Sequence, residues 1–245
     1  MFYLDPLYLV ILFATLIISI GTQFYISSTY KKYSQIRNSM GLTGPQVGKL
    51  IVERTRLGDR PPAIEHGGRG TVFVEGIGFE RTPGQLTDHY DPRTHIVRLS
   101  DGVATTPSVA SMAIVAHELG HAEQHEQGSA LIAARNFLVP AVTISPRISY
   151  ILILIGLLFN LTGLFWLGVI FFGVAVVFAL LTLPVEIDAS RRGLRLLTES
   201  GVMQTEQDAS GARSVLTAAA STYVAAAVTA MLQLLYYISL GRRRG

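Results

Sequence analysis

Residues 148–185 constrain this chain more than any other segment, because 38 consecutive residues there carry no charged side chain. A single helix of that length would extend about 57 Å at about 1.5 Å per residue, whereas the hydrocarbon core of a bilayer is about 30 Å thick. The segment "FNLTG" at 159–163 is the natural place for a turn. Residues 148–184 are therefore predicted to form a transmembrane helical hairpin.

Two further uncharged runs predict membrane helices near the two ends of the sequence. Residues 6–30 are long enough to cross a bilayer, and the basic stretch "KKYSQIR" follows them. This order predicts an uncleaved N-terminal transmembrane anchor at residues 1–30, with the chain after it in the cytoplasm. Residues 214–241 are rich in Ala, Ser and Thr, which suits a C-terminal membrane or bundle helix.

The overall composition supports a multi-pass protein of the cell membrane, with the lipid bilayer as a partner. Charged residues make up only 15% of the chain, against about 25% in soluble domains. The net charge is +3 and no block of basic residues is present, so nucleic acid is not expected as a partner. The chain has no cysteine, which excludes thiolate metal sites and leaves His, Asp and Glu as metal ligands.

Between the anchor and the hairpin, residues 31–147 combine helix and strand signals. A short helix is predicted over 43–58, with Thr43 as its cap and Gly58 at its end. The segments "TVFVEGIGF" and "HIVRLS" have strand character and flank a turn-rich stretch. A second helix is predicted over 106–128, with Thr106 as N-cap and Pro107 at its first position. The predicted fold class is an α+β membrane protein, mainly helical, with a short β-sheet.

The second of these helices contains "HELGH", residues 117–121. His117 and His121 are four residues apart, so they project from one face of a helix and can bind one metal ion. Glu118 is offset by one position and can reach a water molecule at that metal without being a ligand. Catalytic zinc takes three protein ligands and leaves one position for water. One ligand is therefore missing from this motif.

The missing ligand does not lie directly downstream on the same helix. The pattern H-E-x-x-H-x-x-G-x-x-H would need glycine and histidine where this chain has Gln124 and Gln127. His125 lies about 80° around the helix from His117, a poor position for the same ion. It is better interpreted as a surface histidine. A carboxylate on a second helix is the remaining source.

Two acids, Glu186 and Asp188, follow the end of the long apolar run. Pro184 can begin a helix over 185–213, on which the two acids would lie about 200° apart, so that only one can be the ligand. The histidines and this ligand must lie on the same side of the membrane. An even number of crossings must separate them, and the hairpin predicted from length supplies it.

Three segments carry a family resemblance: "GQLTDHYDPRTHIVRLSDGV", "VAHELGHAEQH" and "LPVEIDASRRG". Together they resemble the YugP-like family of membrane-bound zinc metallopeptidases, of the gluzincin type. More distantly, the layout looks like the HtpX and CAAX-prenyl-protease enzymes. The resemblance implies one Zn²⁺ ion bound by His117, His121 and Glu186, and a zincin-like catalytic region over 31–147 that contains the HELGH helix. It also implies Glu118 as the catalytic base and acid.

One position departs from the gluzincin pattern. In gluzincins an Asp four residues after the ligand Glu often orients a zinc-bound histidine, and here Ser190 stands there. The side chain that orients the histidines is therefore not identified, and Asp188 is a candidate.

The predicted function is that of a membrane-bound zinc-dependent endopeptidase acting on proteins or peptides, membrane proteins included. Oxyanion stabilisation could come from His89, Tyr90 or Arg93, and a substrate could pair with the edge of the "VFVEG" strand. An inactive zinc-binding scaffold is disfavoured because it would not need Glu118. A transporter component is disfavoured because the three apolar segments contain no acidic, basic or His residue.

Charges near the membrane place the catalytic region on the cytoplasmic face. Basic residues follow the N-terminal anchor and the hairpin, which favours the cytoplasm for both segments. If 214–241 also crosses, the terminal "GRRRG" ends outside, against the positive-inside rule. The sequence leaves open whether this last helix spans the membrane.

Overall fold

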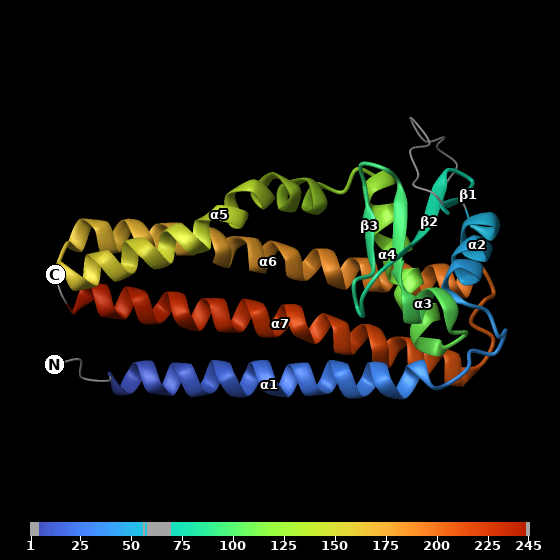
Figure 1. The fold of residues 1–245 in the computed structure, drawn as a ribbon, viewed down its shortest axis with the longest axis horizontal. Helices are drawn as coiled ribbons and strands as arrows, with labels where there is room; N and C mark the ends of the chain where they lie inside the picture. Colours follow the sequence, from blue (N-terminus) through green and yellow to red (C-terminus); the bar gives the residue numbers. More distant parts are fainter. Residues whose placement is uncertain (1–4, 56, 58–69, 244–245) are drawn as a thin grey trace. The chain divides into compact units, whose positions relative to one another are not determined.

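A computed structural model describes residues 5–55, 57 and 70–243 of the chain, and in these residues the main elements are helices. In chain order the elements are α1 (Pro6–Ser34), α2 (Gly44–Arg54), β1 (Val72–Val74), β2 (Ile77–Thr82), β3 (His89–Asp91), β4 (Ile96–Ser100), α3 (Asp101–Thr105), α4 (Val109–Glu126), α5 (Ala130–Leu158), α6 (Thr162–Glu199) and α7 (Glu206–Arg242). Long helices and a small sheet confirm the predicted α+β fold class (Figure 1).

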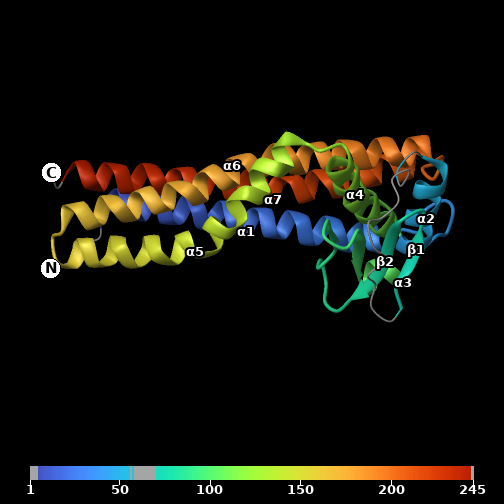
Figure 2. The same ribbon diagram turned by 90° about the horizontal axis from the view of Figure 1, so that it is seen from above.

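The chain divides into two compact units. The membrane unit contains Met1–Phe24, Ala130–Val185 and Ser221–Gly245, and the sheet unit contains Tyr25–Ser129 and Glu186–Ala220. Four helices of the described residues are long and apolar enough to cross a membrane, namely α1, α5, α6 and α7. Figure 2 shows α5 and α6 running antiparallel in the membrane unit.

The hairpin of the membrane unit turns where the sequence predicts. Helix α5 ends at Leu158 and α6 begins at Thr162, and Asn160 between them has a positive φ of 53°. Asparagine tolerates this left-handed conformation better than most residues. Phe165 and Ile153 then pack against each other in a buried cluster next to the turn. The predicted turn at 159–163 is confirmed.

The outer ends of the first and last helices meet within the membrane unit. Asp5 forms an ion pair with Arg243, with 3.3 Å between Oδ2 and the guanidinium nitrogen. Tyr8 and Tyr236 pack with their ring centroids 5.5 Å apart. The start of α1 and the end of α7 therefore lie next to each other.

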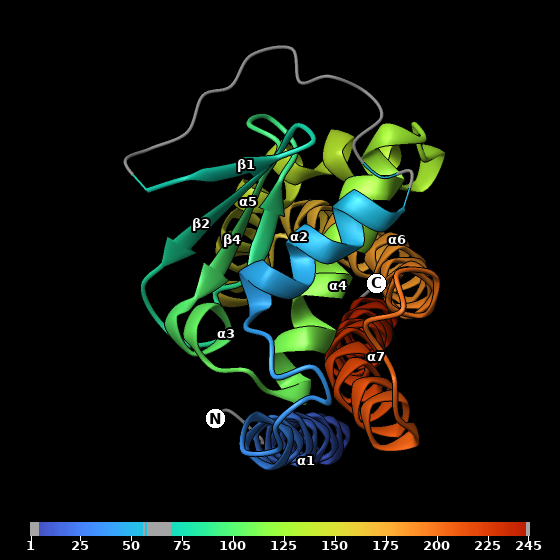
Figure 3. The ribbon, with the colours of Figure 1, turned by 90° about the vertical axis from the view of Figure 1, so that its right-hand side faces the viewer.

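The sheet unit has four strands in the order β1-β2-β4-β3, with β2 and β4 parallel and the outer pairs antiparallel. Helices α2 and α4 cover one face of this sheet (Figure 3). The predicted strand segments contain β1, β4 and the first half of β2, which continues to Thr82 in the stretch predicted as turns. Strand β3 lies inside the stretch that was predicted as turns only, so it is an addition to the predicted sheet.

Two predicted helix boundaries are corrected. Helix α4 begins at Val109 with Ser108 as N-cap, instead of Thr106 and Pro107. The two preceding residues stay extended because Asn38 N–H donates to the Pro107 carbonyl and Arg37 pairs with Ser108. Helix α2 has the predicted Thr43 cap but ends at Arg54, and Gly58 lies outside the described residues.

Membrane-helix boundaries differ more. Pro184 does not begin a helix at 185, because it lies inside α6, which continues without a break to Glu199. Proline removes one backbone hydrogen bond, a loss that membrane helices tolerate when neighbouring groups compensate. Helix α5 begins at Ala130, ahead of the predicted start at 148, and α7 begins at Glu206, ahead of 214.

Candidate metal centre

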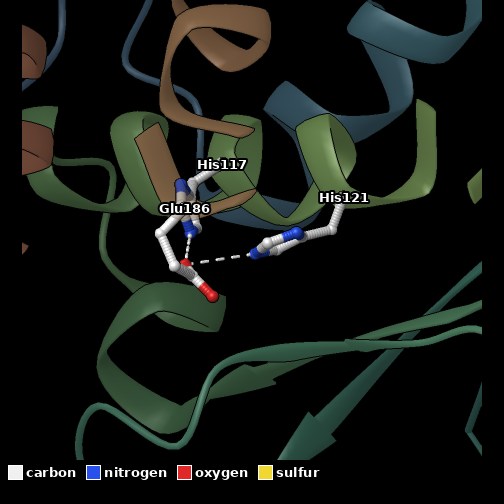
Figure 4. A group of neighbouring side chains, drawn as sticks. All are labelled: His117, His121 and Glu186. Carbon is white, nitrogen blue, oxygen red and sulfur yellow. Dashed lines mark hydrogen bonds and ion pairs between the residues drawn. The ribbon is translucent and has the colours of Figure 1, made fainter. Parts of the chain in front are cut away.

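Helix α4 carries "HELGH", and the faces of the helix that do not carry the histidines are packed in the hydrophobic core. Ser108 caps the helix by accepting a hydrogen bond from the Ser111 N–H, and Met112, Val115 and Leu119 are fully buried against the sheet and α2. His117 and His121 project from the remaining face with their ring centroids 4.8 Å apart. The two imidazole rings therefore point toward the same small region, where both could bind one metal ion (Figure 4).

Glu186 of α6 comes to that same region. Its Oε2 lies 3.2 Å from His117 Nε2 and 3.4 Å from His121 Nε2, and its side chain is only 3% exposed. Two ligand atoms bound to one tetrahedral zinc ion are separated by about 3.3 Å. The donor set of two imidazoles and one carboxylate also suits zinc. The three side chains could hold one metal ion.

Two glycines let α6 approach α4 closely enough to bring Glu186 in. A Cβ added at Gly120 would lie 2.3 Å from the carbonyl oxygen of Ala189. On the other helix, a Cβ at Gly193 would lie 2.7 Å from the carbonyl oxygen of Ala116. Only glycine fits a backbone contact this close. No local pattern in the sequence indicates this role for either glycine.

Glu118 lies beside the candidate ligands and is held by the sheet. It is 7% exposed, and its Oε2 accepts a 2.9 Å hydrogen bond from the Tyr90 N–H on edge strand β3. Asp88, just before that strand, accepts hydrogen bonds from the Ser100 N–H and hydroxyl. Burial raises the pKa of Asp88, partly offset by the bonds from Ser100. The predicted base is thus oriented by a backbone donor.

Each histidine also has a partner at its Nδ1 atom. His121 Nδ1 lies 3.0 Å from Oε1 of Gln124, whose Nε2 donates to Asp188 Oδ2 at 2.7 Å. His117 Nδ1 lies 3.2 Å from the Ser190 hydroxyl. Asp188 is thus linked to His121 through Gln124. From the sequence, Gln124 indicated only that the pattern H-E-x-x-H-x-x-G-x-x-H is absent, and its contact with His121 was not predicted.

His125 belongs to a second aromatic group near the sheet. Its ring lies 5.3 Å from that of His95 and 6.2 Å from that of Tyr90, and the Tyr90 hydroxyl lies 3.1 Å from His95 Nδ1. Burial raises the pKa of Tyr90 and lowers the pKa of His95. His125 is not part of the group formed by His117, His121 and Glu186.

The residues predicted as oxyanion helpers have other neighbours in the structure. The His89 ring bonds the Thr87 carbonyl, and Arg93 is exposed. The "VFVEG" strand, β1, forms the edge of the sheet opposite to β3, whose Tyr90 N–H contacts Glu118. The role of His89, Tyr90 or Arg93 in oxyanion stabilisation stays a prediction.

Known proteins match this chain over most of its length. The chain is 34% identical over 234 residues to the "Putative membrane protease YugP" of Bacillus subtilis (strain 168). The aligned residues cover 96% of this chain and 96% of the relative. No solved structure matches this chain. The sequence pattern of the family described as "Putative neutral zinc metallopeptidase" matches residues 8–67 and 71–242. The chain therefore belongs to this zinc metallopeptidase family.

Proposed function

We propose that the protein is a membrane-bound zinc-dependent endopeptidase. The observation that carries this proposal is the convergence of His117, His121 and Glu186 with Glu118 held beside them. Bound to such a ligand set, zinc supplies Lewis-acid chemistry, because it lowers the pKa of water toward about 7 and polarises a carbonyl group. We propose one Zn²⁺ ion per chain, with proteins or peptides as substrates, including membrane proteins.

In this proposal Glu118 is the general base and then the general acid. Its carboxylate is oriented by the Tyr90 N–H, which contacts Oε2. A fixed carboxylate next to the metal ligands can take a proton from the attacking water and deliver it to the leaving amine.

The test is Glu118→Gln in the purified full chain. The amide has the same shape and still accepts a hydrogen bond from the Tyr90 N–H, but it cannot act as a base. We expect proteolysis of a membrane-protein or peptide substrate to disappear while one zinc ion per chain remains bound. Glu199→Gln, an exposed change on α6, is the matched control and should keep full activity. Cleavage that persists in Glu118→Gln would refute the mechanism.

We also propose that the catalytic site faces the cytoplasm. Basic residues near the membrane support this side: Lys31, Lys32, Arg37, Arg191, Arg192 and Arg195. The terminal arginines then lie outside, where Asp5 neutralises part of their charge through its ion pair with Arg243. A C-terminal reporter fusion should be active only outside the cytoplasm, and a cytoplasmic reporter signal would contradict this orientation.

A further inference from the structure

We infer that Gln124 and Asp188 act together as positioning residues that fix the ring orientation and the protonated nitrogen of His121. This inference rests on the proposed function, because it concerns how a metal ligand is prepared for zinc. Neither side chain belongs to the ligand group itself. Together with Arg192 they form a continuous chain of hydrogen bonds from α6 to the histidine ring.

The contacts in this chain are short. Arg192 Nε donates to Asp188 Oδ2 at 2.7 Å, and Gln124 Nε2 donates to the same oxygen at 2.7 Å. The other end of the Gln124 amide, Oε1, lies 3.0 Å from His121 Nδ1. Two of the three bonds involve the charged carboxylate, which makes them stronger than bonds between neutral groups.

The direction of every bond follows from the two end groups. A guanidinium can only donate and an ionised carboxylate can only accept, so the nitrogen of the Gln124 amide must face Asp188. Its oxygen must then face His121 and accept the proton of Nδ1. The proton is thereby held on Nδ1, and Nε2, which faces Glu186, keeps the lone pair that a metal ion needs.

Burial makes this arrangement hard to replace by water. Gln124 is 1% exposed, and an amide that lost its partners there would leave buried polar groups unpaired. The far end of the chain is also anchored, because Arg192 donates to Gln127, just after α4, and pairs with Glu123 on α4. His121 is thus tied to the helix that carries Glu186.

The two histidines differ in this respect. The partner of His117 is the Ser190 hydroxyl, which can either donate or accept a hydrogen bond, so it does not by itself select a tautomer. The partner of His121 is an amide oxygen whose direction is set by a carboxylate and a guanidinium. Asp188 therefore supports the site through His121 and not through direct contact with a metal.

The test changes the donors and acceptors of this chain in full-length protein purified in detergent. Asp188→Ala removes the oxygen that accepts from both Arg192 Nε and Gln124 Nε2, so the carboxylate that sets the direction in which the Gln124 amide faces His121 is lost. Gln124→Glu places two carboxylates in contact. The double variant Gln124→Glu with Asp188→Asn restores the order, because the new amide donates to the new carboxylate, which accepts from His121 Nδ1.

Zinc affinity, measured by competition with a chelator, is the readout. We expect each single variant to bind zinc about 10- to 100-fold more weakly, and the double variant to return to within about threefold of wild type. Gln207→Met on the exposed start of α7 is the control and should match wild type. A merely structural role would make the double variant at least as weak as the single variants, and that result would overturn the inference.

The outcome also separates this inference from the proposed function. Wild type that binds no zinc contradicts the proposed function, whereas wild type and all variants with equal affinity contradict only the positioning role. Should a variant fail to fold, the ring nitrogens of zinc-loaded wild type provide the check. The Nδ1 proton of His121 should exchange with solvent more slowly than that of His117, and the reverse order would overturn the inference.

Discussion

The contact between Gly120 and α6 gives the sharpest prediction, because the substitution Gly120→Ala adds only one methyl group. That group would lie 2.3 Å from the Ala189 carbonyl oxygen and 3.0 Å from its carbon. Ordinary contacts of this kind are about 3.5 Å long. Both obstacles are backbone atoms, which no side-chain rotation can remove. The two helices must therefore separate by about 1 Å.

Two opposing terms set the expected size of the effect. Alanine favours a helix over glycine by about 1 kcal/mol, whereas overpacking of a tight contact costs about 1–3 kcal/mol. We expect net destabilisation of up to about 2 kcal/mol, which is modest. Zinc affinity should suffer more, because Glu186 Oε2 now lies 3.2 Å and 3.4 Å from the two histidine nitrogens. A shift of about 1 Å there should weaken zinc binding at least about tenfold.

The assay compares thermal unfolding and zinc affinity of full-length variants in detergent. Gly193→Ala tests the same contact from α6, since its Cβ would lie 2.7 Å from the Ala116 carbonyl oxygen. Gly173→Ala is the matched control, because a Cβ there meets nothing within 4 Å. Zinc affinity of Gly120→Ala equal to that of Gly173→Ala would refute the role of the close helix contact.

Three further predictions concern the ligand, the cap and the sheet. Glu186→Gln keeps the size of the side chain but removes the anionic ligand, so zinc content by elemental analysis should fall well below one per chain; unchanged zinc would reject Glu186 as a ligand. Ser108→Ala removes the cap bond to the Ser111 N–H and should lower the free energy of unfolding by about 1 kcal/mol in denaturant titrations, while Ser210→Ala should not. Burial tends to raise the pKa of Asp91, but hydrogen bonds led by that from Arg98 outweigh it and hold this pKa below its usual value. Its stabilising effect is then complete above the unfolded value of about 3.9 and lost as pH falls through the lower folded value, so Asp91→Asn should flatten the acid limb of stability against pH.

The membrane helices, the hairpin turn and the HELGH helix could be predicted because their signals are local. An uncharged run longer than one bilayer crossing requires a turn, and the polar break near its middle is at 159–163. The spacing of His117 and His121 on a helix fixes their common face without any tertiary information. These predictions need only the chain itself and its solvent.

Other features depend on tertiary contacts that no local pattern records. Strand β3 is only three residues long, which is too short to show a strand pattern in the sequence. It is a strand because it pairs with β4, and this pairing is a tertiary contact. The start of α4 is moved by pairing with residues 36–38, which lie about 70 positions earlier. Pro184 predicts a helix start, yet α6 continues through it, and Thr182 and Val185 on either side of the proline are buried.

Both acids of "LPVEIDAS", Glu186 and Asp188, contact residues of α4 although they point to opposite sides of α6. At about 100° per residue, Ala189 and Gly193 share one line of α6, with Glu186 and Ser190 on one flank and Asp188 and Arg192 on the other. The acids do point apart, as the sequence indicates, and only Glu186 joins the ligand group. Because the central line is small enough for backbone contact with α4, both flanks reach that helix. One flank meets His117 and the other meets Gln124, so a single turn of α6 supplies both a candidate ligand and the carboxylate that orients another.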